Sequence, residues 1–439
     1  PSYIIRSMRK MFSHCLKLSY KDTAQQNSYV TIPRAANSFD NTEIAANVDE
    51  DIIDSLTGGR LVGSVTSFEN FAECPLRYYL RYGVDLKERE EFTFSPVNFG
   101  VVLHAVIREV CDEIKKNGES YYLISEEKRR EMVKKSVAAI TDIYQNSILK
   151  DSSRNSFMIK RMEDLADRTV WAMGEQLKCG DFVPFVFEHK FNMEVGDGDR
   201  KQLMSGTIDR IDICENGTDV YVRIIDYKTG KKDFNIVKTY YGIDIQLMVY
   251  MEAAMKLVAK MRPGKNVIPA GVFYYNISDP IVSATTESAE EIEDKIKGEL
   301  RLKGMVNSDK DIAEKMDNTE GTSLNIPVSR KADGGFDSRR SKVMNTEQFN
   351  MLGRFVDVRA IDTADRIVGG DIRRSPYKDG QFSSCDRCPY GAVCGFSVDL
   401  PGCNYRKLKK FDDEVLWNNI KEGVDENGKK MDTGAEERD

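Results

Sequence analysis

The sequence predicts an α/β fold with a mixed β-sheet flanked by helices, and three observations support this prediction. Apolar residues recur at helical spacing over residues 97–117, 125–149 and 154–178. From residue 184 the pattern changes to strand-like alternation in "PFVFEHKFNMEV", "QLMSGTIDRIDI" and "DVYVRIIDYKT", joined by the hairpin-forming "GDGD" and "ENGTD". A helix over 241–260 and the apolar strand "VIPAGVFYYNI" follow. The predicted core is therefore helix, three strands, helix, strand, with extra helices around it.

The regions around this core divide the chain into three predicted parts. Residues 1–59 form an N-terminal connector, and residues 60–410 form the main domain. Residues 411–439 form an acidic tail with the composition of a disordered segment.

Two stretches of the main domain lie outside the predicted core. "SVTSFENFAECPLRYYLRYGVDL" predicts a short strand and then one helix, capped by Thr66 or Ser67 and closed near Gly83. The charged stretch 280–342 predicts a loop or a partly helical insertion, and a helix is expected over 345–369.

Composition limits the classes of protein that fit this chain. Its 439 residues, 41% hydrophobic and 31% charged, are typical of a globular protein with a polar surface. Because the net charge is −7, binding to nucleic acid would depend on a local basic groove. No apolar run is long enough to span a bilayer and no signal peptide is found, so a cytoplasmic protein without a membrane role is expected. No GxxxxGK[ST] motif occurs, which excludes a phosphate loop of the ATPase kind.

An aspartate and a lysine stand two positions apart in the β-prone stretch "IIDYKTGKKDF". On a strand they share a face, so Asp226 and Lys228 lie side by side. Asp209, in "GTIDRID", falls almost opposite Asp226 if the hairpin turns near residues 216–218. Carboxylates this close repel unless a divalent cation such as Mg²⁺ binds both, and Lys228 could then position or deprotonate an attacking water. The alternative for Asp226 and Lys228 is an exposed ion pair.

Other polar residues have both a functional and a structural interpretation. His104 lies on the amphipathic helix "FGVVLHAVIREV", where a lone histidine is more often structural. Gln246 and Tyr250 stand at i, i+4 in "DIQLMVYMEAA", and a buried polar pair is their alternative. Arg210 and Asp212 share the other face of their strand and are expected to form a surface or structural pair.

The motifs GxxxH, GxxDRxD, (D/E)YK and QxxxY, in this order, resemble the RecB-type branch of the PD-(D/E)XK nuclease superfamily. Here they run from Gly100 to His104, Gly206 to Asp212, Asp226 to Lys228, and Gln246 to Tyr250. The resemblance implies a restriction-endonuclease-like core and a DNA nuclease that depends on Mg²⁺ or Mn²⁺.

The resemblance also implies a role for each matched residue. The metal ligands would be His104, Asp209, Asp226 and the backbone carbonyl of Tyr227. Lys228 would assist the attacking water, while Gln246 and Tyr250 would line the DNA side of the site. Glu188, in "FEHKF", is expected as an auxiliary acid.

Four of the nine cysteines are grouped in a way that predicts a metal site. "SSCDRCPYGAVCGF" carries Cys385, Cys388 and Cys394, and Cys74 stands far upstream in "FAECPLRYYLRYG". Four thiolates can hold zinc or an iron–sulfur cluster, and the spacing alone does not choose between them. The odd total argues for reduced thiols rather than a disulfide framework.

The cysteine arrangement resembles the iron–sulfur nucleases of the AddB type, which carry one cysteine before the nuclease core and three after it. This resemblance implies a [4Fe–4S] cluster held by Cys74, Cys385, Cys388 and Cys394, which would staple the two ends of the domain together. It further implies that residues 1–59 are the end of a preceding helicase-like domain, and that an AddA-type helicase–nuclease subunit is the partner.

The function expected from these resemblances is exonucleolytic hydrolysis of DNA during double-strand-break processing, acting on the 5′-terminated strand. In "LRYYLRYG" basic and aromatic residues alternate, which suits stacking on a single strand or on DNA ends, or else a helix that packs its tyrosines inward. The two alternatives are a stand-alone RecB-like iron–sulfur exonuclease and a non-catalytic scaffold that binds DNA ends.

Overall fold

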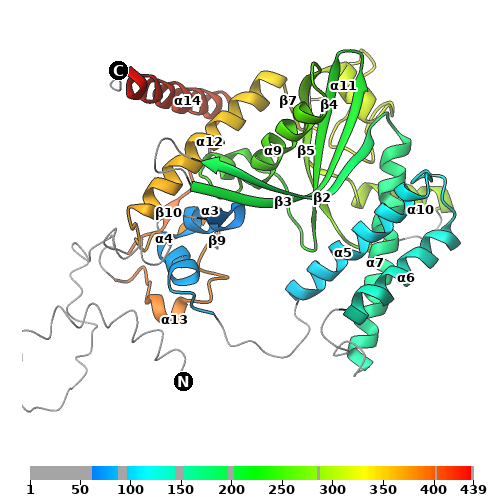
Figure 1. Cartoon of the computed structure of the whole chain (residues 1–439), viewed down its shortest axis with the longest axis horizontal. Helices are drawn as coiled ribbons and strands as arrows, with labels where there is room; N and C mark the ends of the chain where they lie inside the picture. The colour runs from blue at the N-terminus through cyan, green and yellow to red at the C-terminus, as the bar shows by residue number, and fades with distance from the viewer. Residues whose placement is uncertain are drawn as a thin grey trace, which may run out of the picture.

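A seven-stranded mixed sheet forms the centre of the protein, seen in a computed structural model that describes residues 62–87, 96–143, 153–195, 202–283, 287–400 and 403–436 (Figure 1). The strands are β1 (Val62–Ser64), β2 (Val183–Val195), β3 (Gln202–Asn216), β4 (Asp219–Lys228), β5 (Asn266–Asn276), β6 (Lys303–Asn307) and β7 (Val343–Met344). Their order is β1-β3-β4-β5-β6-β7, and β2 also pairs with β3. The β2–β3–β4 pairs are antiparallel and β4–β5 is parallel, which confirms the predicted mixed sheet.

Helices cover both faces of this sheet, as Figure 1 shows. One buried cluster joins the sheet to α5 (Pro96–Lys116), α6 (Glu126–Ile143) and α7 (Ser153–Lys178). A second cluster joins it to α3 (Val65–Glu73), α9 (Gln246–Met261) and α12 (Thr346–Val368). Strand β4 serves both, because alternate side chains point to opposite faces. Val220, Val222 and Ile224 belong to the second cluster, and Tyr221, Ile225 and Tyr227 to the first.

The β3–β4 hairpin sets the register on which the prediction for the two aspartates depends. Its two-residue turn follows Asn216, which pairs with Asp219, and Gly217 adopts a φ of 60°. A glycine at the first central position with positive φ suits a tight hairpin turn. Arg210 pairs with Ile225, so the next position in register sets Asp209 opposite Asp226.

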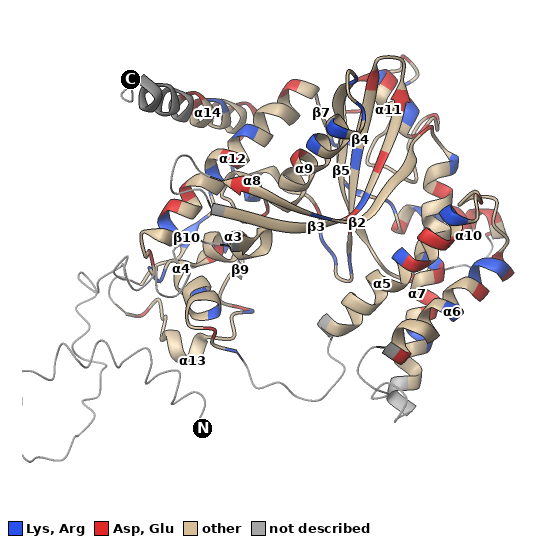
Figure 2. Ribbon diagram, in the orientation of Figure 1, with Lys and Arg blue, Asp and Glu red and all other residues tan. Residues whose placement is uncertain are grey.

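The stretch predicted as a loop or insertion, residues 280–342, contributes to the sheet and its core. It contains α10 (Ala289–Glu299), β6 and α11 (Lys310–Met316), and β6 pairs antiparallel with β5. Leu302 and Val306 are fully buried. Its many charges lie outside, and Figure 2 shows acidic and basic residues interspersed on α10 and α11. Charge density therefore concealed a short apolar pattern.

The acidic tail also differs from its prediction. It forms α14 (Asp413–Glu436), which packs against α12. Leu416 and Ile420, one turn apart, are buried, and the acidic first turn favours the helix dipole. The N-terminal connector, residues 1–59, lies outside the described residues.

The helix predicted before Gly83 is in fact three successive pieces. Ser64 caps α3, its side chain accepting a hydrogen bond from the Ser67 backbone N–H, so the predicted cap at Thr66 or Ser67 is wrong by two or three residues. Pro75 lacks an N–H and starts a new helix, α4 (Pro75–Tyr78), followed by the π-helix η2 (Tyr79–Gly83).

A small lobe follows α12 and lies beside α3 and α4 in Figure 1. It contains β8 (Tyr377–Asp379), β9 (Phe382–Ser383), α13 (Gly391–Cys394) and β10 (Arg406–Lys407), and we name it the cysteine lobe. No described helix is long and apolar enough to cross a bilayer.

Candidate active site and cysteine site

Three side chains from three different elements converge at one edge of the sheet. His104 comes from α5, Glu188 from β2 and Asp209 from β3. His104 Nδ1 lies 3.3 Å from Asp209 Oδ1 and 3.7 Å from Glu188 Oε1. Each offers a ligand atom within 4.8 Å of the others, so the three can bind one cation together.

Asp226 and Lys228 complete this site from β4, the strand next to Asp209. Asp226 is 2% exposed, and its Oδ2 atom contacts Lys228 Nζ. No described N–H or O–H donates a well-directed hydrogen bond to that oxygen. Burial, and then the charge of Asp209, raise the pKa of Asp226 to about 6 against the opposing charge of Lys228. A buried carboxylate oxygen without a donor fits a place where a cation binds.

The backbone of β4 orients Asp209. The Tyr227 N–H donates a 2.6 Å hydrogen bond to Asp209 Oδ2, which leaves Oδ1 toward His104. The Tyr227 ring packs edge-to-face on the His104 ring at 5.9 Å. Tyr227 therefore positions two of the predicted ligands, while its own carbonyl remains a predicted ligand.

His104 carries a proton in the metal-free site. Burial lowers its pKa, but hydrogen bonds to Asp209 and Glu188 and their charges outweigh burial and raise the pKa to about 10. A cation that binds Nδ1 must displace this proton, and it would then neutralise the same carboxylates.

Glu188 was predicted only as an auxiliary acid, yet it is one of the three convergent residues. It has a φ of 49°, in the left-handed region that non-glycine residues seldom adopt. Its neighbours Phe187 and His189 pair with Arg210 and Ile208, so Glu188 falls opposite Asp209. Neither this backbone conformation nor the β2–β3 register is evident in "FEHKF".

Gln246 and Tyr250 form the hydrogen-bonded pair that the sequence suggested, with Gln246 Nε2 donating to the Tyr250 hydroxyl at 2.9 Å. Tyr250 also lines an open groove with residues of β2, β3 and the start of α3: Ser64, Val65, Thr66, Lys190, Phe191, Asn192, Ser205, Gly206 and Thr207. A Cβ on Gly206 would lie 2.7 Å from Phe191 and 3.0 Å from Tyr250, so glycine is required there. The pair thus lies at a surface recess beside the acidic site.

Arg210 and Asp212 form a buried structural pair rather than a surface one. Arg210 donates two 2.7 Å hydrogen bonds to Asp212, and Arg223 donates a third at 2.9 Å. All three side chains are at most 1% exposed. Burial raises the pKa of Asp212, but the charges of Arg210 and Arg223 lower it further, so the net shift is downward.

Sequence reasoning missed a polar network beside the acidic site. Asp244 accepts a 2.7 Å hydrogen bond from the Tyr274 hydroxyl and pairs with Lys232 at 3.0 Å. Lys232 Nζ also lies 4.5 Å from the centre of the Tyr274 ring. The charged run "GKKDF" was the available signal, but burial of its second lysine is decided by strands β4 and β5.

The four grouped cysteines all line one cavity between α4 and the cysteine lobe: Cys74, Cys385, Cys388 and Cys394. Burial raises the pKa of Cys394 to about 11 and also raises that of Cys74 and Cys385. Such thiols stay protonated unless a metal binds them. No three of the four sulfurs lie within 4.8 Å of one another in the described chain.

The fold and the site define a class of protein. A family model described as the PD-(D/E)XK nuclease superfamily matches residues 63–395, and the chain belongs to this superfamily. The predicted restriction-endonuclease-like core is thereby confirmed.

More particular relatives share a name that makes each of them one subunit of an ATP-dependent helicase/deoxyribonuclease. The chain is 33% identical over 380 residues to the relative from Thermoanaerobacter sp. (strain X514), covering 84% of this chain and 33% of the relative. It is 34% identical over 383 residues to that of Clostridium acetobutylicum, covering 85% and 33%. It is 34% identical over 398 residues to that of Caldanaerobacter subterraneus, covering 88% and 34%. The chain therefore spans about a third of the length of these relatives.

Proposed function

We propose that this chain is a metal-dependent DNA exonuclease, the nuclease part of a helicase–nuclease that processes double-strand breaks. The observation that supports it most is the convergence of His104, Glu188 and Asp209 beside Asp226 and Lys228 in a PD-(D/E)XK superfamily member. The relatives' names, which combine helicase and deoxyribonuclease, support the assembly. Cleavage of the 5′-terminated strand and a cytoplasmic location complete the proposal.

The residues at this site fit a Mg²⁺ or Mn²⁺ ion. His104, Asp209 and Asp226 would hold it together with the Tyr227 carbonyl. A bound ion would supply Lewis-acid chemistry and lower the pKa of a water molecule. Lys228, whose Nζ already lies against Asp226, would orient the attacking water and stabilise charge that develops on the phosphate.

The groove beside Tyr250 suits a DNA strand that approaches this ion. Lys190 lies exposed on the groove and pairs with no acidic residue of the described chain. In "LRYYLRYG", Tyr78 is buried against Phe71, whereas Tyr82 is 39% exposed with the Arg81 guanidinium over its ring. Inward packing thus accounts for one tyrosine, and Tyr82 would be available to stack on a base.

At the four cysteines we propose a [4Fe–4S] cluster that acts as a structural clamp. A single zinc ion about 2.3 Å from each sulfur would hold the sulfurs about 3.8 Å apart. The wider spacing of these sulfurs favours a group in which each cysteine binds a different iron. Ligation would close a loop of roughly 300 residues between Cys74 and the other three.

The nuclease proposal is tested with end-labelled linear DNA and anaerobically purified protein, in Mg²⁺ or in EDTA. Asp226→Ala and Lys228→Ala should both abolish the metal-dependent shortening of DNA, and the released label gives the polarity. Asp219→Ala, at the far end of β4, is the matched control and should cut normally.

An AddA-type helicase subunit is then added to the same reactions. If the wild type binds DNA ends but cuts nothing with or without that subunit, the scaffold alternative replaces the nuclease. Full activity without any helicase would favour the stand-alone exonuclease.

The cluster proposal has its own test, which is the metal content of the purified chain. We expect about four irons and four sulfides per chain, lost in Cys388→Ser and retained in Cys179→Ser, whose thiol lies outside the cavity. About one zinc per chain would contradict the cluster.

A further inference from the structure

The carboxylate of Glu69 lies in the middle of α3 and reaches the start of α9. Its Oε1 atom accepts hydrogen bonds from the backbone N–H groups of Ile245 at 2.9 Å and Gln246 at 3.0 Å. The first N–H groups of a helix have no partner within it, and the apolar side chain of Ile245 cannot cap them. A negative charge here is also favoured by the helix dipole. Glu69 therefore caps α9 from a different helix.

The helix end that is capped in this way is the one that carries two predicted site residues. Gln246 is the first residue of α9 and Tyr250 lies one turn later, joined by their 2.9 Å hydrogen bond. On the other side of the same turn, Asp244 is held by Tyr274 and Lys232. The orientation of the Gln246–Tyr250 pair thus depends on this capped turn.

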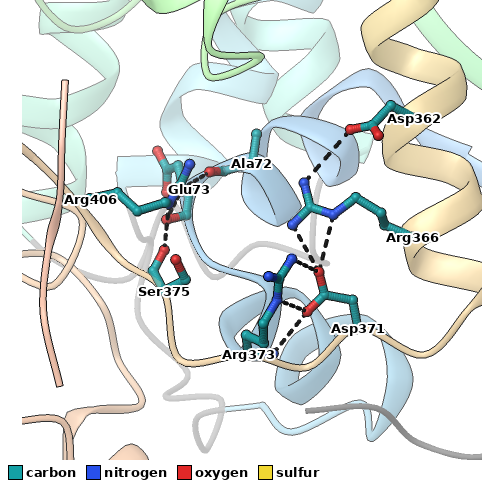
Figure 3. A network of polar contacts seen from close by, with 8 residues as sticks. All are labelled: Ala72, Glu73, Asp362, Arg366, Asp371, Arg373, Ser375 and Arg406. Carbon is teal, nitrogen blue, oxygen red and sulfur yellow. Dashed lines mark hydrogen bonds and ion pairs between the residues drawn. The ribbon is translucent and has the colours of Figure 1, made fainter. Parts of the chain in front are cut away.

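The opposite end of α3 is held by the cysteine lobe, as Figure 3 shows. The Arg406 guanidinium donates to the backbone carbonyls of Ala72 and Glu73, and also to that of Ser375 at 3.0 Å. The Ser384 hydroxyl donates to the Glu73 carbonyl at 3.5 Å. Cys74, the residue that ends α3, lines the cavity of the four cysteines.

A second group in Figure 3 fixes the chain that leads into this lobe. Asp371 accepts hydrogen bonds from Arg366 at 2.8 Å and from Arg373 at 2.7 Å. Arg366 belongs to α12 and also lies 5.0 Å from the centre of the Phe71 ring on α3. The nine-residue helix α3 is therefore anchored at the cysteine lobe and makes its polar contact with α9 through Glu69.

We propose that Glu69 is a positioning residue that couples the four-cysteine site to the DNA side of the active site. Metal binding at the cysteines fixes the C-terminal end of α3, and the Glu69 carboxylate passes that constraint to the first turn of α9. The effect on catalysis rests on the proposed nuclease function, whereas the capping contact does not.

The test compares Glu69→Leu, which removes the acceptor, with Glu69→Gln, which keeps one. Glu252→Gln is the control, because Glu252 lies further along α9 and forms an ion pair with Lys256 on the same helix. For the full chain with Mg²⁺ and a single-stranded oligonucleotide, Glu69→Leu should lower kcat about tenfold or more and change KM less than twofold. Glu69→Gln should recover most of kcat.

Hydrogen exchange supplies a readout that is independent of catalysis. Peptides covering residues 243–250 should exchange about tenfold faster in Glu69→Leu, while peptides from β5 and the iron content stay as in the wild type. Unchanged exchange at 243–250, or faster exchange throughout the chain, would overturn the positioning role. If no variant and no wild type cuts DNA, the nuclease proposal fails and the exchange result still decides the cap.

The coupling itself is tested with a double-mutant cycle that adds Cys388→Ser. Loss of the cluster should speed exchange at 243–250 in the wild-type background and add little in the Glu69→Leu background. Additive effects in the two backgrounds would mean that the two sites act independently, which would contradict the coupling.

Discussion

Two buried carboxylates on the same hairpin, Asp212 and Asp226, show opposite electrostatic designs. Asp212 receives hydrogen bonds from two arginines, and its pKa is lowered. Asp226 has an oxygen without a donor, and its pKa is raised to about 6. The first carboxylate is satisfied by the protein alone. The second becomes stable as an anion only when a cation binds, which is why it belongs to a site of function.

The largest effect expected from this comparison is on catalysis. Asp226→Asn keeps the shape of the side chain but removes the charge that would hold the ion, so DNA cleavage should fall by about 10³-fold or more. The rate of release of end label measures this. Asp219→Asn on the same strand should cut like the wild type, and a loss below tenfold for Asp226→Asn would separate this residue from the metal.

The next largest effect is on the free energy of unfolding. Asp212→Asn leaves Arg210 and Arg223 buried without a compensating charge, which should destabilise the protein by about 3–5 kcal/mol. Urea denaturation in EDTA measures it. Asp226→Asn, studied in the same way, should be neutral or stabilising because it removes an unsatisfied buried charge. Equal destabilisation by both substitutions would refute the distinction.

A smaller effect is expected from the metal itself. Mg²⁺ at ten times its dissociation constant should stabilise the folded protein by about 1.4 kcal/mol, because it binds the folded site alone. The rise in melting temperature on adding Mg²⁺ measures this, and Asp226→Asn should reduce it. Asp212→Asn should keep the rise if it folds at all.

The smallest effect is a difference in pH dependence between Asp226→Asn and the wild type. The pKa of Asp226 rises from 3.8 to about 6 on folding, so the native state binds the extra proton between these values. Stability of the wild type relative to the variant should therefore fall as pH rises from about 4 to about 6 in EDTA. Denaturation at a series of pH values tests this, and a relative stability that rises over this range would show the opposite sign.

Much of the acidic site could be predicted because its geometry is local. The two-residue turn after Asn216 and strand alternation set Asp209 opposite Asp226 with Lys228 beside it. The helices α5, α7, α9 and α12 also follow from apolar periodicity, within a few residues of their predicted bounds. Boundaries failed where a single residue decided them, as at Ser64 and Pro75.

The sequence by itself determined the order of the motifs, the hairpin register and the cysteine spacing, since each depends on neighbours along the chain. Only the tertiary structure decided that Glu188 joins His104, that Asp212 is buried between two arginines, and that Glu69 caps α9. These outcomes depend on burial and on contacts between residues far apart in the chain. Local periodicity does not encode such contacts, because it reports which face of an element is apolar and not what that face meets.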